Sequence, residues 1–568
     1  MSARTSRRSL PALLLALLLA LTGCAEIPMS SSVGVMPVPD ELGEPVTQID
    51  PDGPSPGAGP DEIVRGFLLA GVGAGNNFEV ARSFLTGDAA EEWAPLAGVT
   101  VMPSGSDLAD VEARVTSDQQ ELGLDVPVQG TVDAQGVYRS SEPGATSRME
   151  FRLRQENGEW RISAAPNGIV LSLANFQSVF QSYSIYFFDP SFSYFVPEDR
   201  WIPNRASIAT DVVQRLLQGP PEWLAGAVVS AIPEGLRLGS DAVTIQEGVA
   251  TVSLDESAAA LNDRGRALLR AQLEATLEQI ATVSSVEIEV AGEELDANEQ
   301  VTVERTVPIP QQPVVVSGQR LARLDGTRLA SVPDSPELAQ AAAPAVSLDN
   351  GFYAYLADDG QSLRRFSHEP EVQDTELAAG EDLIGPSIDR MDVVWTGERD
   401  NPGELLVVLP EGGTSTISVP FLQGRQVQRI RVSRDGSRLL VVSSDDEGDH
   451  LSVVGVNRNS SGMPVAVASS VPLELGERYQ RIVDASWGSL GRIVVLGSQG
   501  SGQPHIWSSR IGDPPEDLGI VEDARTVTAA EDNRSIRVGT GDGTLVSHVS
   551  GSWQRLVDLT VWAPAYPG

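Results

Sequence analysis

One short pattern recurs through the C-terminal half of the chain and limits what that half can fold into. Each copy is a polar turn followed by an apolar, β-branched run such as Leu439-Leu440-Val441-Val442. The turn aspartates Asp349, Asp389 and Asp435 are spaced by 40 and 46 residues. A four-stranded propeller blade takes roughly 40–50 residues, so the spacing predicts a β-propeller of about five or six blades. The turns occupy residues 347–351, 387–390, 433–436, 486–489 and 530–533.

Composition removes several classes of function. The 568 residues include 78 acidic and 40 basic ones, which gives a formal net charge of −38. Nucleic-acid binding needs cations that neutralise phosphates, so that partner is excluded. Every basic residue is arginine, which rules out a P-loop lysine and a Schiff-base lysine. A single cysteine allows no internal disulfide and no thiolate metal cluster. We therefore expect no cofactor and no metal site.

The first 24 residues predict export and a lipid anchor. Three arginines precede an apolar run at 10–21, which is shorter than the roughly 20 residues that span a bilayer. The run ends Leu21-Thr22-Gly23-Cys24, which resembles the bacterial lipobox, whose cysteine is acylated, for example with palmitate. We expect residues 1–23 to be a lipoprotein signal peptide and Cys24 to be lipidated, on the extracytoplasmic face of the cell membrane. The alternative is an ordinary signal peptide with an incidental cysteine.

The pattern along the chain predicts a multidomain protein with two α+β domains and an all-β C-terminal propeller. Residues 25–60 contain eight prolines and five glycines, so 24–60 is the lipidated cysteine and a tether that does not fold. Two helices and a strand meander make 61–181 an α+β domain, with Asp61 capping the first helix. Alternating strands and helices at 182–292 form a second one. Residues 293–315 are a linker and 316–568 the propeller.

Hydrophobic periodicity places the elements of the second α+β domain. It predicts helices at 208–217 and 264–280 and strands at 184–188, 249–254 and 286–290. Gly219-Pro220-Pro221 ends the first of these helices.

An aromatic segment lies where the two α+β domains meet. It places nine aromatic residues within the 22 positions 180–201. Exposed rings would be a stacking platform for sugars, whereas buried rings would be the core of a hairpin packed between two domains. The hairpin interpretation is favoured. The nine are Phe180, Tyr183, Tyr186, Phe187, Phe188, Phe192, Tyr194, Phe195 and Trp201.

The best enzymatic hypothesis rests on carboxylates. A glycoside hydrolase needs two carboxyl groups at a set separation, and Asp349, Asp389, Asp435 and Asp532 recur along the predicted propeller. Aspartate followed by glycine or asparagine is also what tight turns require. Such turns at a blade edge would point the acids into water, away from a central channel.

Other motifs give no site. The sequence contains no Gly-x-Ser-x-Gly and no His-Glu-x-x-His. The acidic turns 445–449 and 541–543 lack the twelve-residue calcium loop with its terminal glutamate. Four histidines are isolated in sequence and are interpreted as surface or blade residues: His368, His450, His505 and His548. We therefore predict no catalytic residue.

Residues 182–292 resemble the GerMN domain of sporulation and germination proteins. The matching residues are helix stops, turns and strands, and none is chemically a catalyst. The stretches are Leu216-Leu217-Gln218-Gly219-Pro220, Ile232-Pro233-Glu234-Gly235 and Gly248-Val249-Ala250-Thr251-Val252-Ser253-Leu254-Asp255.

The order of lipobox, tether, α+β domain, GerMN-like domain and propeller resembles the LpqB family of actinobacterial lipoproteins. The resemblance implies a non-catalytic membrane lipoprotein that binds the extracellular domain of the sensor kinase MtrB, of the MtrA–MtrB two-component system, in cell-division and cell-envelope signalling. Alternatives are a protein that binds peptidoglycan or another glycan, and a propeller-type glycoside hydrolase. Further matching stretches are Ile63-Val64-Arg65-Gly66-Phe67-Leu68, Ala81-Arg82-Ser83-Phe84-Leu85-Thr86, Gly158-Glu159-Trp160-Arg161-Ile162, Tyr186-Phe187-Phe188-Asp189-Pro190 and Val196-Pro197-Glu198-Asp199-Arg200-Trp201.

Overall fold

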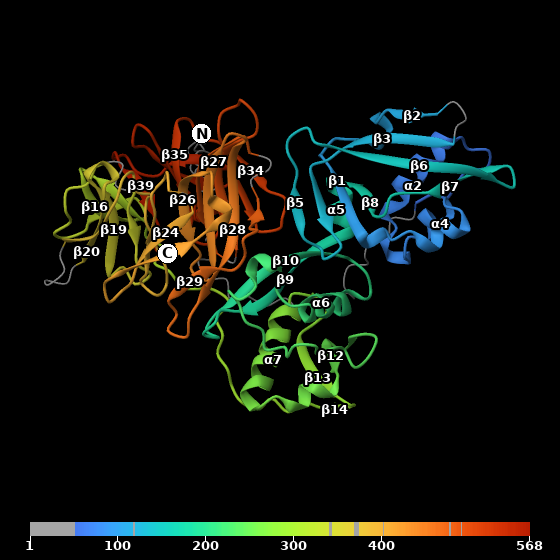
Figure 1. Cartoon of the computed structure of the whole chain (residues 1–568), viewed down its shortest axis with the longest axis horizontal. Helices are drawn as coiled ribbons and strands as arrows, with labels where there is room; N and C mark the ends of the chain where they lie inside the picture. Colours follow the sequence, from blue (N-terminus) through green and yellow to red (C-terminus); the bar gives the residue numbers. More distant parts are fainter. Residues whose placement is uncertain are drawn as a thin grey trace, which may run out of the picture. The chain divides into compact units, whose positions relative to one another are not determined.

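A computed structural model describes residues 51–568 except 117–119, 340–342, 368–373, 402, 476–478 and 490. The described residues all belong to one compact unit (Figure 1). The predicted signal peptide, Cys24, most of the tether and His368 lie outside the described residues.

The first folded part is an α+β domain, as predicted. Its two four-stranded sheets have the orders β5-β4-β1-β8 and β2-β3-β6-β7, and helices pack against them over a shared apolar core. The helices are α2 (Pro60–Leu69), α3 (Glu79–Ser83), α4 (Gly87–Glu92) and α5 (Leu173–Val179). The strands are β1 (Gly98–Met102), β2 (Ala113–Val115), β3 (Glu121–Pro127), β4 (Gly130–Asp133), β5 (Tyr138–Ser140), β6 (Thr146–Glu156), β7 (Glu159–Ala164) and β8 (Ile169–Ser172).

The start of α2 differs from the prediction. Asp61 does not cap the helix, because the N-cap is Gly59 and Pro60 is the first helical residue. Proline suits that position, since its missing N–H has no partner there in any helix. Asp61 instead lies in the first turn and pairs with Arg65 one turn later, at 2.9 Å.

A long hairpin follows, formed by β9 (Phe180–Phe188) and β10 (Phe195–Pro203). The sequence predicted only its end, a strand at 184–188. The next elements form the second α+β domain, in which the sheet order is β11-β12-β13-β14. Its parallel pair β12–β13 is joined through α7, the crossover that a parallel pair requires. The bounds are α6 (Ile208–Leu217), β11 (Thr244–Gln246), β12 (Val249–Leu254), α7 (Asp263–Leu277), β13 (Ser285–Val290) and β14 (Glu293–Glu294).

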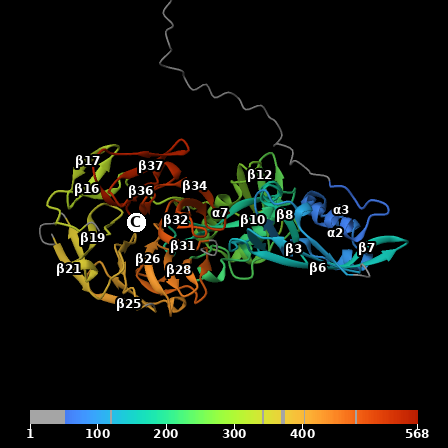
Figure 2. The ribbon, with the colours of Figure 1, turned by 90° about the horizontal axis from the view of Figure 1, so that it is seen from above.

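The C-terminal part is all β, and its sheets are arranged in a ring in Figure 2. In the described residues six antiparallel sheets follow one another, each with four strands in its main path. The first, β17-β16-β15-β39, joins β15 to β39 from the far end of the sequence, which closes the ring. Its strands are β15 (Val314–Ser317), β16 (Arg320–Asp325), β17 (Arg328–Ser331) and β39 (Trp562–Ala565).

The other five sheets use consecutive strands. The second and third contain β18 (Ala345–Val346), β19 (Phe352–Ala357), β20 (Ser362–Ser367), β21 (Asp374–Ala379), β22 (Ser387–Ile388), β23 (Val394–Thr396), β24 (Glu404–Val408) and β25 (Thr414–Ser418). The fourth contains β26 (Gln426–Val432), β27 (Arg438–Asp445), β28 (Gly448–Arg458) and β29 (Pro464–Val467), with β30 (Leu473–Glu474) beside β28. The last two contain β31 (Arg481–Trp487), β32 (Arg492–Ser498), β33 (His505–Arg510), β34 (Glu516–Ile520), β35 (Ala524–Thr528), β36 (Arg537–Thr540), β37 (Leu545–Val549) and β38 (Ser552–Arg555).

The five repeated turns of the sequence all occupy the same place in these sheets. Each links the first strand of a sheet to the second, as residues 433–437 link β26 to β27. The repetition in sequence is therefore a repetition of one hairpin turn, and the turns of several sheets contact the β9–β10 hairpin.

Candidate functional site

The β9–β10 hairpin contacts all three folded parts, and its surroundings are the candidate functional site. Trp201 on β10 donates its backbone N–H to Gly136 of the first domain at 2.8 Å. Its indole Nε1 donates to the carbonyl of Gly512, in the propeller, at 2.8 Å. Among the described elements β9 forms a sheet only with β10, and glutamines of the second domain bond to the backbone of its other edge. Gln279, just after α7, accepts from Ser184 N and donates to Ser184 O.

The tip of the hairpin is fixed by Asp189, which is fully buried. Its carboxylate accepts hydrogen bonds from the backbone N–H groups of Ser191, Ser193 and Tyr194, which shape the turn. Arg390, from the repeated turn of the third propeller sheet, donates Nη2 to the same carboxylate. Arg390 also donates Nε to the carbonyl of Asp435 at 2.9 Å, so it ties the hairpin to two propeller turns.

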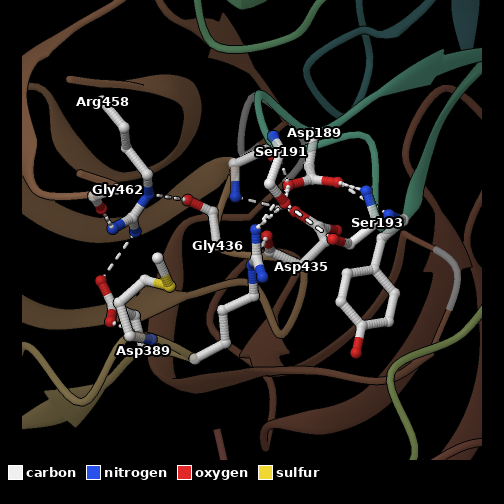
Figure 3. Close-up of polar contacts among 12 residues, drawn as sticks. Asp189, Ser191, Ser193, Asp389, Asp435, Gly436, Arg458 and Gly462 are labelled. Carbon is white, nitrogen blue, oxygen red and sulfur yellow. Dashed lines mark hydrogen bonds and ion pairs between the residues drawn. The ribbon is translucent and has the colours of Figure 1, made fainter. Parts of the chain in front are cut away.

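Beside this ion pair lies a second buried one within the propeller. Asp389 accepts from Nη2 of Arg458 at 2.7 Å and from the indole N–H of Trp395 at 3.0 Å. Arg458 in turn donates to the carbonyls of Gly436 and Gly462, each at 2.8 Å (Figure 3). The two ion pairs therefore hold together the third and fourth sheets and the hairpin tip.

A third polar cluster lies near the base of the hairpin. Asp199 of β10 accepts from Ser184 Oγ and from Arg510 Nη2, both at 2.6 Å. Ser182 donates its hydroxyl to Asp513 at 2.8 Å. Both Arg510 and Asp513 belong to the fifth sheet and the turn that follows β33. Arg438 of the fourth sheet donates Nη1 to the carbonyl of Pro197 at 3.3 Å, so polar bonds from the hairpin reach three of the propeller sheets.

Burial changes the pKa values of the acids in these contacts. It raises the pKa of Asp513 to about 6, and the neighbouring Asp199 adds to the shift. It also raises the pKa of Glu198 to about 7, although the paired Arg200 acts in the opposite direction. Asp435 is different. Burial would raise its pKa, but Arg438 and hydrogen bonds from Ser437 and Ser433 outweigh it and lower the pKa overall.

The four recurrent aspartates do the work that tight turns require. The carboxylate of each accepts a hydrogen bond from the backbone N–H of the residue two positions further along the chain, as Asp435 does from Ser437 at 2.8 Å. Asp349 and Asp532 are exposed, as expected. The expectation that all four point into water was wrong for Asp389 and Asp435. Arginines from the adjoining strands cover both, so they are 1% and 9% exposed.

The aromatic segment is a hairpin core, which confirms the favoured interpretation. Seven of its nine rings are buried, and Phe192 and Tyr194 near the tip are half-buried. Trp201 packs against Phe176 of the first domain with 4.4 Å between ring centroids. A row of exposed rings suited to sugar stacking is therefore not present at 180–201.

The remaining candidates have local partners. His450 bonds Asp445 at 2.8 Å and His505 bonds Asp517 at 2.9 Å, while His548 packs on the ring of Trp553. In the acidic turn at 541–543, Asp542 accepts from Thr540 and Thr544. Among the described residues there is no group of three or more His, Cys, Asp or Glu side chains arranged to hold a metal ion.

Sequence reasoning missed the arginines that join the hairpin to the propeller. Arg390 and Asp189 are 201 positions apart, and Arg510 and Asp199 are 311 apart. The only local signal is that Arg390 directly follows a turn aspartate, and Asp189 occurs in one of the stretches quoted above. Neither signal indicates which distant residue forms the ion pair.

Three family models together match most of the described chain. The family described as "Lipoprotein LpqB, N-terminal domain" matches residues 53–177, and "Sporulation and spore germination" matches 184–296. "Lipoprotein LpqB beta-propeller domain" matches 319–567.

Several curated relatives match over most of their length. A Lipoprotein LpqB of Cutibacterium acnes is 27% identical, over 88% of this chain and 87% of that one. One from Streptomyces avermitilis is also 27% identical, over 96% of both chains. Among solved structures, TolB from Acinetobacter baumannii has a TM-score of 0.33 and 13% identity over 45% of this chain and 66% of that one.

The described residues include no helix that is both long and apolar enough to cross a bilayer. The family matches cover the N-terminal domain, the GerMN-type domain and the propeller, in the order in which the structure shows them. On these matches and on the relatives that span the chain, the protein belongs to the LpqB family of lipoproteins.

Proposed function

We propose that this protein is a non-catalytic lipoprotein that is anchored through Cys24 on the extracytoplasmic face of the cell membrane. In this proposal residues 1–23 are its signal peptide and 24–60 its tether. The folded body, with domains at 61–181, 182–292 and 316–568, binds the extracellular domain of an MtrB-like sensor kinase. By binding, it modulates cell-envelope and cell-division signalling.

The observation that carries the proposal is the central position of the β9–β10 hairpin. Buried ion pairs and backbone hydrogen bonds from this one hairpin reach the first domain, the second domain and the propeller. Breaking one partner of a buried ion pair is strongly destabilising, so these contacts resist separation of the domains. A body of this kind suits a docking protein, since a partner that binds one domain meets surfaces held in fixed register with the others.

The contacts of the recurrent turn aspartates weigh against their use as the catalytic acids of a glycoside hydrolase. A general acid needs a carboxyl group with a raised pKa facing the substrate. Asp435 has a lowered pKa and is paired with Arg438 at 2.6 Å, and Asp389 is paired with Arg458. Both also cap their own turns, so their carboxylates are occupied.

Glycan binding loses its main support as well, because the aromatic segment is buried. Peptidoglycan binding would need a surface other than the aromatic segment at 180–201. We therefore place partner binding ahead of both alternatives.

The test is direct binding between residues 26–568 and the isolated extracellular domain of the sensor kinase. Surface plasmon resonance at about 50 and 200 mM salt measures affinity and its salt dependence. With a net charge of −38 on the whole chain, we expect saturable binding with an association rate that falls at higher salt.

Two controls make the result specific. The extracellular domain of an unrelated sensor kinase should give no saturable signal. Soluble peptidoglycan fragments, tested on the same surface, should give none either. Lack of binding to the MtrB-like domain at concentrations up to about 100 μM, by a folded protein, would contradict the proposal, since Kd values above this range correspond to less than roughly 5.5 kcal/mol of binding energy.

A further inference from the structure

The propeller has a small cavity along its axis that the proposed function does not use. It has a volume of about 80 Å³ and is lined by inner strands of several sheets, including β26, β31, β35 and β39. Figure 2 shows the end of the chain at the centre of the ring, and Tyr566 and Gly568 belong to the lining. A single ordered water needs roughly 10–15 Å³ on this measure, so the cavity holds several waters or one small oxyanion.

Arginine dominates the charge of this lining. Arg429, Arg431 and Arg434 line the cavity, against one acidic side chain, that of Asp484. This excess of positive charge occurs in a protein whose acidic residues outnumber basic ones 78 to 40. The balance inside the cavity is thus opposite to that of the whole chain.

This one acidic side chain cannot neutralise all three guanidinium groups. Asp484 interacts with Nε of Arg429 at 3.3 Å and also accepts from the backbone N–H groups of Ala485 and Val527. The guanidinium of Arg434 donates hydrogen bonds to the main-chain carbonyls of residues 488, 529, 530 and 567. These hydrogen bonds fix the position of Arg434. Their acceptors are neutral carbonyls, so they do not neutralise its charge.

Arg431 is the cation with most of its donors free. The one hydrogen bond that its side chain makes within the described residues goes from Nη1 to the carbonyl of Ile430, at 2.8 Å. A guanidinium has five N–H donors. Burial lowers the pKa of Arg431. Asp484 opposes this shift and Arg429 adds to it, and the net effect disfavours the charged form. Buried charges in proteins are normally paired, and two of these three guanidinium groups have no carboxylate partner in the described chain.

We propose that the axial cavity of the propeller is a binding site for a small oxyanion, a phosphate or carboxylate group, held by Arg431 with help from Arg429. A guanidinium presents parallel N–H donors that match two oxygens of such a group. Arg429 keeps 32% of its side chain exposed, which gives the anion a route from solvent. Arg434 and the residues beside it, 566–568, close the cavity from the other side.

Calorimetric titration of residues 26–568 with sodium phosphate and with sodium acetate tests the site. Ionic strength is held constant with sodium chloride, so that only specific anion binding gives heat. We expect saturable binding of phosphate or acetate, and R431Q should weaken it about tenfold or more, the loss of a charge-assisted hydrogen bond. The arm with the higher affinity shows which of the two groups the site takes.

The matched control is R525Q. Arg525 is also an arginine on an inner strand, β35, but it is exposed, pairs with Asp523 at 2.6 Å and does not line the cavity. R525Q should leave the affinity unchanged. If both variants weakened the anion affinity equally, the effect would be one of bulk charge and the proposal would be overturned. Phosphate and acetate affinities no higher than that of chloride would also overturn it.

A second measurement on the unaltered protein covers the case in which R431Q does not fold. Crystals soaked in selenate, an oxyanion with an anomalous signal, should show a peak beside the guanidinium of Arg431. Selenate at other arginines but not in the cavity would overturn the proposal.

Discussion

Arg390 of the propeller and Asp189 of the hairpin form an ion pair across 201 positions of sequence, in which the aspartate side chain has no solvent exposure and the arginine 14%. The pair lies where a tight turn of β9–β10 meets two repeated turns of the propeller. Because three backbone N–H groups already satisfy the aspartate, the arginine adds charge neutralisation and connects the domains. The contact is both a turn cap and a domain junction.

Replacing Arg390 tests how strongly this junction holds. R390M should lower the free energy of unfolding by about 3 kcal/mol, because it leaves a buried carboxylate without its cation. The double variant D189N/R390M should recover at least about 1 kcal/mol, since the uncompensated charge is gone. Urea unfolding followed by circular dichroism measures both. R364Q, which breaks an exposed pair with Asp374, should change stability by less than about 1 kcal/mol, and a similar loss in R364Q and R390M would contradict the argument.

Asp513 predicts an unusual pH dependence at the hairpin base. Its pKa of about 6 lies above the value of an unfolded aspartate, about 4, so the folded state binds the proton more tightly. Ionisation of Asp513 therefore lowers the free energy of unfolding as pH rises from about 4 to 6. Above pH 6 the free energy stays at this lower level. D513N should be more stable than the parent at pH 7.5 by on the order of 1–3 kcal/mol, and the difference should disappear near pH 4. Thermal and urea unfolding across this range measure it. D558N, at an exposed aspartate, should show a difference that does not vary with pH.

Gly66 is predicted to be required for packing in the first domain. A Cβ at this position would lie 2.5 Å from Cε1 of Phe84, a buried ring on the segment after α3. Alanine would gain about 1 kcal/mol of helix propensity, but overpacking a core costs about 1–3 kcal/mol. G66A should therefore be destabilised overall. G87A is the control, because a Cβ there meets nothing within 4 Å, and it should be neutral or slightly stabilised. If G66A were as stable as G87A, the close packing of α2 on Phe84 would be wrong.

The lipid anchor is tested at Cys24. C24A should abolish incorporation of a labelled fatty acid and release the protein from the membrane fraction, because no other cysteine can be acylated. Western blotting of membrane and soluble fractions measures where the protein is found. S30A, which keeps the cysteine, is the control. Persistent labelling of C24A would refute the anchor.

The sequence was most informative where structure depends on neighbours along the chain. Helix α6 (Ile208–Leu217) and strand β12 (Val249–Leu254) have the predicted bounds, because an apolar face and flanking turn residues decide both. The repeated turns were also predicted, since aspartate side chains cap them locally. These signals lie within a few residues of the elements that they specify.

Prediction failed where a distant residue decides the outcome. Asp349 and Asp389 occupy equivalent turns, yet one is exposed and the other buried, because Arg458 covers Asp389 from 69 positions away. The first residues of β9 were missed because Phe180 to Tyr183 pair with Arg200 to Pro203 only once the hairpin has formed. The axial arginines share a cavity only after the ring has closed.

The pairing of β15 with β39 sets the order in which the propeller can be completed. Its first sheet lacks its fourth strand until Trp562–Ala565 has emerged, about 250 residues after Val314 has been synthesised. Until then β15 presents an unpaired edge to any neighbouring chain, and such edges recruit strands from other molecules. The propeller therefore finishes folding only after Trp562–Ala565 has been synthesised. A nonsense mutation that removes only β39 would leave an open, aggregation-prone ring and not a slightly shorter protein.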